Sequence, residues 1–302
     1  MSKVRQEITI IILAYKSAHI IENALDQIVN KGFNIKVIDN GSNDNIADLL
    51  QEKYANSGIE LIMLENNVGF SRGNNVALKK VITKYAFLLN PDAIIDPESI
   101  DNLVQEMEKD DKIALANPIF LGNQEVMQEK INARKKESEP KNNVKLRNFI
   151  CCGSSLMKMN IFKNIGFLDE KLFLYCEDVE ISDRSIESGY KNIVVSNAYT
   201  FHVDQKSVKI ENYLHKYQIL YKRNWYLGWG RTYLKTRNKN IFKIYLKAFH
   251  RLFLSVFYLL KFDVNKSIAR LALFIGSMSY LLGFDCFNKT NKITQIKEKY
   301  II

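Results

Sequence analysis

The sequence predicts an α/β fold built on a mostly parallel sheet flanked by helices, and three observations support this prediction. Apolar runs of strand length alternate with amphipathic segments of helical length through the first 90 residues. The runs are continuously apolar, as in strands that are buried on both faces. Polar clusters follow the ends of three of the runs, where such sheets bind ligands. The chain has 302 residues, which suits one α/β domain with an extension.

The elements of the first half follow in a regular order. The first run, ITIIILA at 8–14, is rich in β-branched residues and predicts a buried strand. A β-α-β-α-β-α-β order implies parallel strands whose crossover helices cover both faces of the sheet. Ser71 is the expected N-cap of the third helix. We expect helices at 18–30, 43–54 and 71–84, and further strands at 34–40, 59–64 and 85–89.

The second half is less regular. Residues 121–148 are polar and rich in Lys, Glu and Asn, which predicts a mobile excursion between two sheet segments. Apolar character resumes at 149–159, and an acidic cluster lies within 166–190. The stretch 192–202 predicts two short strands.

The cysteines and the first residues indicate a reducing compartment. None of the cysteines has the spacing of zinc ligands, and the N-terminal residues show no secretory cleavage pattern. We therefore expect a cytoplasmic protein without disulfides. The four cysteines are Cys151, Cys152, Cys176 and Cys286.

Charge is distributed unevenly along the chain. The net charge is +10, but the residues from Lys206 onward carry 19 basic and four acidic side chains, leaving the preceding part with a net charge of −5. An anionic partner is therefore expected for the last third alone, either membrane lipid or nucleic acid. Aromatic residues among the basic ones motivate the nucleic-acid reading. These are Tyr213, Tyr217, Tyr221, Trp225, Tyr226 and Trp229.

Two polar clusters suit a nucleotide. In VIDNGSND (37–44) an acid at a strand end precedes Gly-Ser, where a carboxylate can accept from a base N–H or a ribose hydroxyl. In NNVGFSRGNN (66–75) two glycines allow close approach of the backbone, and the forked donors of Arg72 match a diphosphate. Each cluster alone is equally consistent with a capped turn before a helix.

Three further clusters suit a metal and an acid–base group. Asp92 in LLNPDA (88–93) follows a strand end and offers oxygen to a divalent cation. FLYCEDVEISDRSIESG (173–189) crowds three carboxylates at a helix start, beside apolar residues that would raise a carboxyl pKa and suit a general base. His202 ends the last expected strand. A Pro-Asp turn, helix capping and a structural histidine are the alternatives.

The five clusters in this order resemble glycosyltransferase family 2, which has the GT-A fold. The resemblance covers roughly residues 7–210, and the block GFLDEKLFLYCEDVEISDR (166–184) is its longest part. The nearest branch resembles bacterial rhamnosyltransferase-type enzymes of surface polysaccharide synthesis, with patterns such as VVDNGSxD, NxGFAxGNN and LLNPD. In this family the residues at the strand ends bind a metal and a nucleotide sugar, so we expect no nucleic-acid partner.

The resemblance implies roles for individual residues. Asp178 matches the catalytic base, with Glu177 the next candidate. Asp92 matches the second acid of the metal motif and His202 a late metal ligand, so a divalent Mn or Mg ion is implied. The residues implied to surround the nucleotide are Ala14, Tyr15, Asp39, Asn67, Arg72 and Asn74, together with Asp92.

Three departures from the family pattern matter. Asn90 replaces the first acid of the metal motif, which predicts weaker metal binding. Ala14 replaces a threonine, and Glu180 replaces an aspartate and is expected to lengthen an arm near the acceptor. These changes keep open the alternative of a non-catalytic GT-A scaffold protein in a membrane glycan-assembly complex.

The expected activity is inverting, metal-dependent transfer of a sugar from a nucleotide diphosphate to a glycan or lipid-linked acceptor. The branch resemblance favours dTDP-rhamnose as donor, while UDP-hexoses and galactofuranose stay open. One displacement by an activated acceptor hydroxyl inverts the anomeric centre, and no second nucleophile is needed.

The expected domains are a GT-A catalytic domain (1–210) and a basic amphipathic helical extension (211–302). Lys243, Lys247 and Arg251 recur every four residues and predict a basic stripe that faces anionic head groups. The uncharged stretch 271–284 is about 21 Å long as a helix, short of a ~30 Å hydrocarbon core. We expect peripheral association with the inner face of the cell membrane. The alternative is an amphipathic helix that packs on the catalytic domain.

Overall fold

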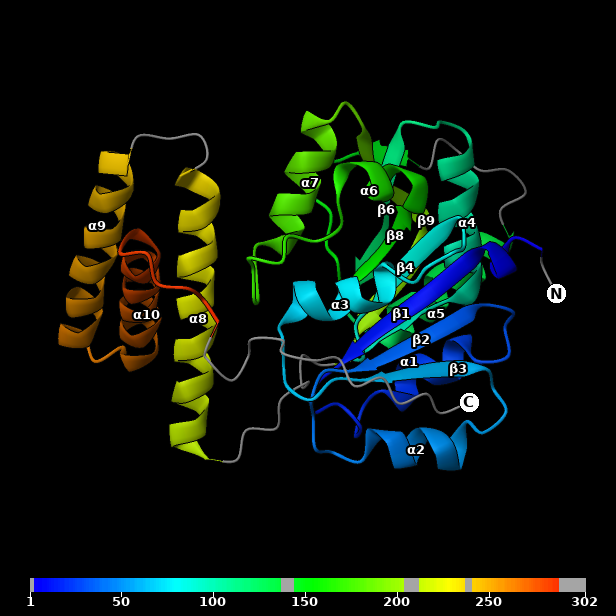
Figure 1. Cartoon of the computed structure of the whole chain (residues 1–302), viewed down its shortest axis with the longest axis horizontal. Coiled ribbons are helices and arrows are strands. Elements are labelled where there is room, and N and C mark those ends of the chain that lie inside the picture. The colour runs from blue at the N-terminus through cyan, green and yellow to red at the C-terminus, as the bar shows by residue number, and fades with distance from the viewer. Residues whose placement is uncertain (1–2, 137–143, 204–211, 237–240, 288–302) are drawn as a thin grey trace.

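The computed structural model describes residues 3–136, 144–203, 212–236 and 241–287. Among these residues, nine strands form one sheet in the order β3-β2-β1-β4-β8-β6-β9-β5, with β7 pairing to β9 (Figure 1). The expected domain boundary between residues 210 and 211 lies outside the described ranges. The strands are β1 (Ile8–Ala14), β2 (Asn34–Asp39), β3 (Ile59–Met63), β4 (Tyr85–Leu89), β5 (Ala93–Ile95), β6 (Ile113–Leu121), β7 (Val144–Leu146), β8 (Ser154–Lys158) and β9 (Lys191–His202).

The sheet is mixed, which corrects the expectation of a mostly parallel one. The pairs β1–β2, β2–β3, β1–β4 and β6–β9 are parallel, but β8 runs antiparallel to both of its neighbours. The reason lies in the connection from β6. That strand ends at the carboxyl edge, and the chain returns to the sheet from the same edge, so β8 must run in the opposite direction.

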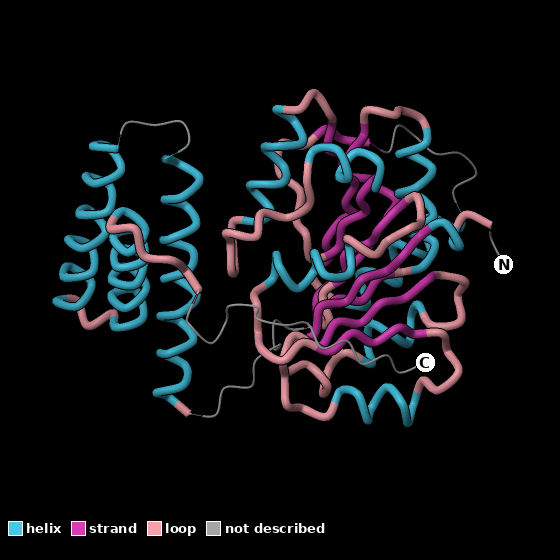
Figure 2. Tube along the Cα trace, in the orientation of Figure 1, coloured by secondary structure: helices cyan, strands magenta, loops and turns pink. Residues whose placement is uncertain are grey.

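Helices cover both faces of the sheet (Figure 2). Because side chains alternate along a strand, Ile10 and Ile12 pack with α1, α2 and α4, while Ile11 packs with α3, α6 and α7 on the other face. The helices of the sheet domain are α1 (Glu22–Ile28), α2 (Ile46–Lys53), α3 (Phe70–Leu78), α4 (Pro97–Glu108), α5 (Gln124–Lys136), α6 (Met159–Ile165) and α7 (Glu177–Glu187).

The first helices occur in the predicted order but are shorter than predicted. The third one, α3, begins after Gly69 and not at Ser71, whose side chain is buried inside the helix. Gly69 has a φ of +85°, and a Cβ on it would lie 2.4 Å from the Phe173 carbonyl oxygen. A residue without a Cβ is therefore required at this helix start.

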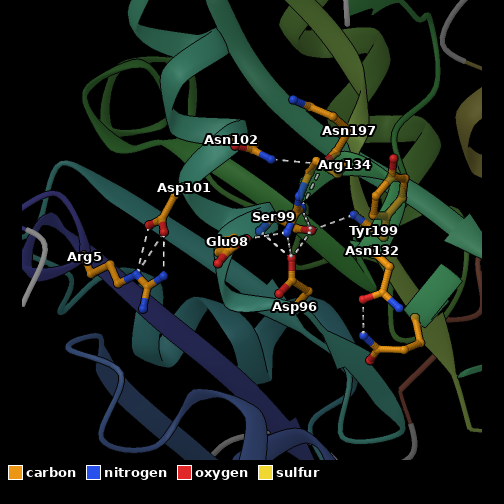
Figure 3. Close-up of polar contacts among 11 residues, drawn as sticks. Arg5, Asp96, Glu98, Ser99, Asp101, Asn102, Asn132, Arg134, Asn197 and Tyr199 are labelled. Atoms are coloured by element: carbon orange, nitrogen blue, oxygen red, sulfur yellow. Dashed lines mark hydrogen bonds and ion pairs between the residues drawn. The ribbon is translucent and has the colours of Figure 1, made fainter. Parts of the chain in front are cut away.

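The excursion at 121–148 is partly ordered, which corrects the prediction that it is mobile. Helix α5 buries Met127 and Ile131 against β9. Its Arg134 binds Asp96 at 2.6 Å and also donates to the Asn197 carbonyl oxygen (Figure 3). The segment 137–143 lies outside the described residues.

The stretch predicted as two short strands is one strand, β9. Its pairing with β6 shifts register between Pro118 and Ile119, so that Pro118 pairs with Val195 and Ile119 with Tyr199. Such an irregularity breaks the alternation of side chains without ending the strand, which explains why the pattern looked like two strands.

The extension forms three helices, α8 (Tyr213–Thr236), α9 (Ile241–Leu260) and α10 (Val264–Leu281). They stand beside the sheet domain, yellow to orange in Figure 1. Helices α8 and α10 pack closely together. A Cβ added to Gly276 of α10 would lie 2.1 Å from the Trp225 carbonyl oxygen of α8, so the close approach requires glycine at this position. None of the helices within the described ranges is long and apolar enough to span a membrane.

A shared apolar cluster joins the extension to the sheet domain. Trp229 and Tyr233 of α8 pack on Leu172 and Phe173 of the loop before α7. Helix α8 of the extension therefore packs on the sheet domain.

The expected basic stripe of α9 is only partly solvent-facing. Lys243 and Lys247 are exposed, but Arg251 turns inward and donates to the Ser277 hydroxyl at 2.6 Å. Burial lowers the pKa of Arg251. Arg251 therefore links α9 to α10 through this hydrogen bond and does not face lipid head groups.

Candidate active site

The carboxyl ends of β1 and β2 lie side by side. Ala14 pairs with Asp39, and the backbone N–H of Asn40 donates to the Ala14 carbonyl oxygen at 2.8 Å. One carboxylate oxygen of Asp39 accepts from both the backbone N–H and the hydroxyl of Ser42. Asp39 therefore closes a turn and does not cap the next helix, whose N-cap is Asn45, and the turn fixes the orientation of the Asp39 carboxylate at this edge.

The second cluster folds against the first. The Asn67 side-chain oxygen accepts from Asn40 at 3.1 Å and from the backbone N–H of Gly69 at 2.9 Å. The Asn40 side-chain oxygen in turn accepts from Val68 at 3.0 Å. The two predicted clusters thus form one interlocked turn, in which Asn67 is a structural element as well as a candidate ligand.

Arg72 and Asn74 point in different directions from α3. The Arg72 Nε donates to the Glu170 carbonyl oxygen at 3.0 Å. Asn74 is buried and its amide donates to Phe70 of its own helix at 3.0 Å. Asn75, which sequence reasoning missed, bonds to Leu168 and so fixes α3 against the loop that follows α6.

Tyr15 directly follows the end of β1, at the same edge of the sheet. It is 39% exposed, and the Lys16 ammonium is 5.8 Å from the centre of its ring. Burial, with smaller contributions from Cys286 and Tyr15, raises the pKa of Tyr226 to about 12.

The two predicted metal ligands are brought together. The register of β5 with β9 places Ala93 opposite His202, and His202 Nδ1 lies 3.2 Å from an Asp92 carboxylate oxygen. The His202 ring stacks on Phe120 with the ring centres 5.5 Å apart. This stacking fixes the imidazole plane beside the carboxylate.

A short segment joins this pair to the acidic cluster. The Cys152 backbone N–H donates to Asp178 at 2.8 Å, and the next residue, Gly153, accepts from the Asn90 backbone N–H at 2.9 Å. Asn90 immediately precedes the Pro-Asp turn that carries Asp92. The candidate base Asp178 and the candidate metal motif therefore lie on either side of residues 151–153.

The two adjacent carboxyls at the start of α7 are electrostatically unusual. Burial, reinforced by the charge of Asp178, raises the pKa of Glu177 to about 8. The second oxygen of Glu177 is buried without a hydrogen-bond partner among the described residues. Burial also raises the pKa of Asp178, while the N–H of Cys152 opposes that shift. Burial therefore favours the neutral form of both carboxyls, while the N–H of Cys152 favours ionisation of Asp178.

Glu180 does not reach toward an acceptor, which corrects the expectation for this residue. It is buried and forms a bidentate pair with Arg184, at 2.9 and 2.8 Å. Arg184 also donates to the carbonyl oxygens of Ile165 and Gly166. The longer side chain of Glu180 thus braces the loop between α6 and α7.

The loop before α7 is held in a strained conformation by α8. Tyr175 and Cys176 both have positive φ values, +66° and +72°. Each such residue costs about 1–3 kcal/mol and persists only when its surroundings hold it. Arg223 of α8 donates to the Tyr175 hydroxyl at 2.7 Å. Sequence reasoning missed this role, because the aromatic and basic residues of α8 were considered as a nucleic-acid surface.

A profile of the family described as Glycosyl transferase family 2 matches residues 9–166. The chain therefore belongs to glycosyl transferase family 2.

Similar sequences carry related descriptions. An uncharacterized glycosyltransferase of Haemophilus influenzae is 25% identical over 222 residues, which cover 66% of this chain and 67% of that protein. A poly-β-1,6-N-acetyl-D-glucosamine synthase of Staphylococcus epidermidis is 23% identical over 35% of this chain. The match covers only 26% of the length of that synthase.

Solved structures share the fold. The mannosyltransferase PcManGT of Pyrobaculum calidifontis, solved with GDP-mannose and Mn²⁺, aligns over 91% of this chain and 87% of its own, with a TM-score of 0.57 and 13% identity. TarS 1-349 of S. aureus, solved with UDP-GlcNAc, aligns over 98% and 99%, with a TM-score of 0.50 and 14% identity. At these identities the likeness concerns the fold alone.

Proposed function

We propose that this protein is an inverting glycosyltransferase that moves a sugar from a nucleotide diphosphate to a hydroxyl of a glycan or lipid-linked acceptor. The observation that carries the proposal is the placement of Asp178 and of the Asp92–His202 pair on either side of residues 151–153. A base and a site for the leaving diphosphate must flank the anomeric carbon, and this arrangement supports both proposed roles.

In the proposed reaction Asp178 accepts the proton of the acceptor hydroxyl as its oxygen bonds to the anomeric carbon. The bond from that carbon to the diphosphate oxygen breaks on the opposite face, and the electron pair leaves with the diphosphate. Arg72 donates to the departing phosphates. A single displacement of this kind inverts the anomeric configuration.

A divalent cation fits the Asp92–His202 pair. Carboxylate oxygen together with imidazole suits Mn²⁺ better than Ca²⁺. No group of three or more His, Cys, Asp or Glu side chains that could hold a metal is found in the described ranges. Two protein ligands suffice where substrate phosphates and water complete the coordination, as is common for Mg²⁺. When bound, such an ion would neutralise charge on the leaving diphosphate.

The sugar is proposed from the named relatives. Poly-β-1,6-N-acetyl-D-glucosamine synthases are among the similar proteins, and TarS was solved with UDP-GlcNAc. The comparisons give no support for rhamnose. UDP-N-acetylglucosamine is therefore the first donor to test, with dTDP-rhamnose and GDP-mannose beside it.

We also propose that α9 rests on the cytoplasmic face of an anionic membrane. Its outer face is a continuous apolar arc, and Lys243 and Lys247 flank one side of it. An apolar face with basic flanks is typical of interfacial helices, because head-group phosphates attract the flanking charges. A second copy of the chain would instead bring like charges together. The arc comprises Phe242, Leu246, Phe249, Phe253, Val256, Phe257 and Leu260.

The activity is tested by nucleotide release and acceptor labelling with a panel of donors, with Mn²⁺ or with excess chelator. Asp178→Asn should lower kcat more than a hundredfold while the Kd for donor stays within about threefold, because the acid acts on the acceptor. Glu187→Gln, an exposed change in the same helix, is the matched control. Retention of more than about a tenth of the activity would remove Asp178 from its role, since a tenfold loss is only about 1.4 kcal/mol.

The scaffold alternative rests on Asn90, which lacks the charge of the first motif acid. Turnover of any donor in the panel excludes this alternative. Full activity in excess chelator would overturn the metal part of the proposal while leaving the transferase assignment intact.

A further inference from the structure

The residues after α10 return to the sheet domain and are pinned there. The Trp229 indole N–H donates to the Phe284 carbonyl oxygen at 2.9 Å. The Cys286 thiol donates to the Lys171 carbonyl oxygen at 3.1 Å. Cys286 and Phe287 are both buried. These bonds leave the segment 284–287 little freedom beside the loop that precedes α7.

Phe287 lies directly on Arg72. The guanidinium carbon is 3.5 Å from the centre of the Phe287 ring, and that ring meets Phe173 edge-on at 5.4 Å. A ring in this position covers one face of the planar guanidinium but leaves its edge accessible. The Arg72 Nε is engaged by Glu170, and among the described residues the terminal nitrogens have no hydrogen-bond partner.

We propose that Phe287 is a positioning residue for the donor diphosphate. By covering the face of the guanidinium, it fixes the plane of Arg72 and keeps water from that face, so that the two terminal nitrogens meet the phosphates in one orientation. The inference rests on the proposed donor-binding role of Arg72. It extends the donor site to a residue 121 positions beyond the region that matches the family profile, which ends at 166.

The experiment measures binding to the full chain of whichever of UDP, GDP and dTDP binds most tightly in the presence of Mn²⁺. Phe287→Leu and Phe287→Met should weaken binding about tenfold, as expected for a desolvated cation–π contact, and Phe287→Tyr should stay within about twofold. Binding of the corresponding nucleoside, which lacks phosphates, should not change. Phe284→Leu, an exposed position in the same segment, is the control.

A double-mutant comparison separates this inference from the proposed function. If Arg72→Ala alone leaves diphosphate binding unchanged, the proposed role of Arg72 fails. If Arg72→Ala weakens binding and Phe287→Leu weakens it by the same factor with or without Arg72, the two residues act independently and the inference fails. Loss of nucleoside binding in the Phe287 variants would also overturn it, because that outcome indicates general disruption of the site. The inference stands if Phe287→Leu weakens binding when Arg72 is present and has no effect once Arg72 is absent, and it fails if Phe287→Leu has no effect in either background.

Discussion

Glu177 and Asp178, the two neighbouring carboxyls at the start of α7, differ in their hydrogen bonding. Glu177 is enclosed and lacks a partner for one oxygen, whereas Asp178 receives the N–H of Cys152. Both cannot ionise easily at such a short separation in a buried site. A proton on Glu177 therefore relieves the repulsion between the two carboxyls.

This pair predicts how stability depends on pH. The folded-state pKa of Glu177 is raised from its ordinary value to about 8, so the stabilisation is complete below the ordinary carboxyl pKa and is lost as pH rises through 8. The wild-type free energy of unfolding should fall by on the order of 2 kcal/mol between about pH 5 and pH 8. Urea denaturation across this range checks the prediction.

Glu177→Gln, which imitates the protonated form, should flatten most of that decline, and Glu187→Gln on the exposed side of the same helix should leave it unchanged. An identical pH dependence in wild type and Glu177→Gln would show that other groups cause it.

Replacing Asn90 with aspartate should increase the affinity for the metal. Asn90 stands two residues before Asp92, where an acid completes the family motif, and its side chain contacts Gly153. Asn90→Asp adds an anionic oxygen of nearly equal size, so the Mn²⁺ concentration for half-maximal activity should fall at least about fivefold, corresponding to about 1 kcal/mol. A metal titration of activity measures this. An unchanged titration would indicate that residue 90 does not face the ion.

Much of the site could be predicted at this scale, but not the partners of each side chain. Asp92 and His202 are 110 residues apart in sequence and lie 3.2 Å apart in the fold, while their role as metal ligands stays a prediction. The inward turn of Glu180 toward Arg184 could not be read from sequence, because a carboxylate four residues before an arginine also suits an exposed helical pair. Local sequence indicates which groups are present, whereas tertiary packing decides which way each one faces.

Among the elements, α5 shows how a polar segment becomes ordered. Its composition suggested mobility because few of its residues are apolar. Met127 and Ile131, one helical turn apart, suffice for one packed face, and Arg134 supplies the polar anchor. The periodicity of two apolar residues was too weak a signal to distinguish this helix from a loop.

The anchor predicts a measurable loss of stability. Arg134 and Asp96 are both only 13% exposed, so Arg134→Ala leaves a nearly buried carboxylate without its ion-pair partner, bonded among the described residues only to the N–H and hydroxyl of Ser99. The cost should be about 3 kcal/mol of unfolding free energy, measured by urea denaturation. Lys130→Ala, on the exposed side of α5, should cost less than about 0.5 kcal/mol. Equal effects of the two substitutions would show that α5 is not fixed by this ion pair.

In the whole molecule, α9 lies on the side of the three-helix bundle away from the sheet domain (Figure 1), and the residues of its apolar arc are exposed. Because α8 supports the loop before α7, removing the whole extension would also disturb the sheet domain. Such a truncation is therefore a poor test of membrane binding. Point variants on α9 leave the bundle contacts of Ile244 and Ala248 in place.

The double variant Leu246→Ser, Phe253→Ser should reduce flotation with anionic vesicles by at least about tenfold, since each buried large apolar side chain contributes more than 1 kcal/mol. Neutral vesicles should bind the wild type less well, and high salt should release part of it. Ile82→Ser with Leu146→Ser, which changes two exposed apolar residues of the sheet domain, is the control. Equal flotation of the two double variants would reassign the arc to another role.

The ring of Phe287 over Arg72 also has a consequence for synthesis on the ribosome. Arg72 emerges more than 200 residues before the aromatic side chain that covers it. At translation rates of about 5–20 residues per second, the interval is on the order of 10–40 s. Throughout that time the nascent sheet domain holds an uncovered arginine. A newly made chain should therefore acquire full affinity for its donor only after the bundle has folded back, long after its sheet could first form.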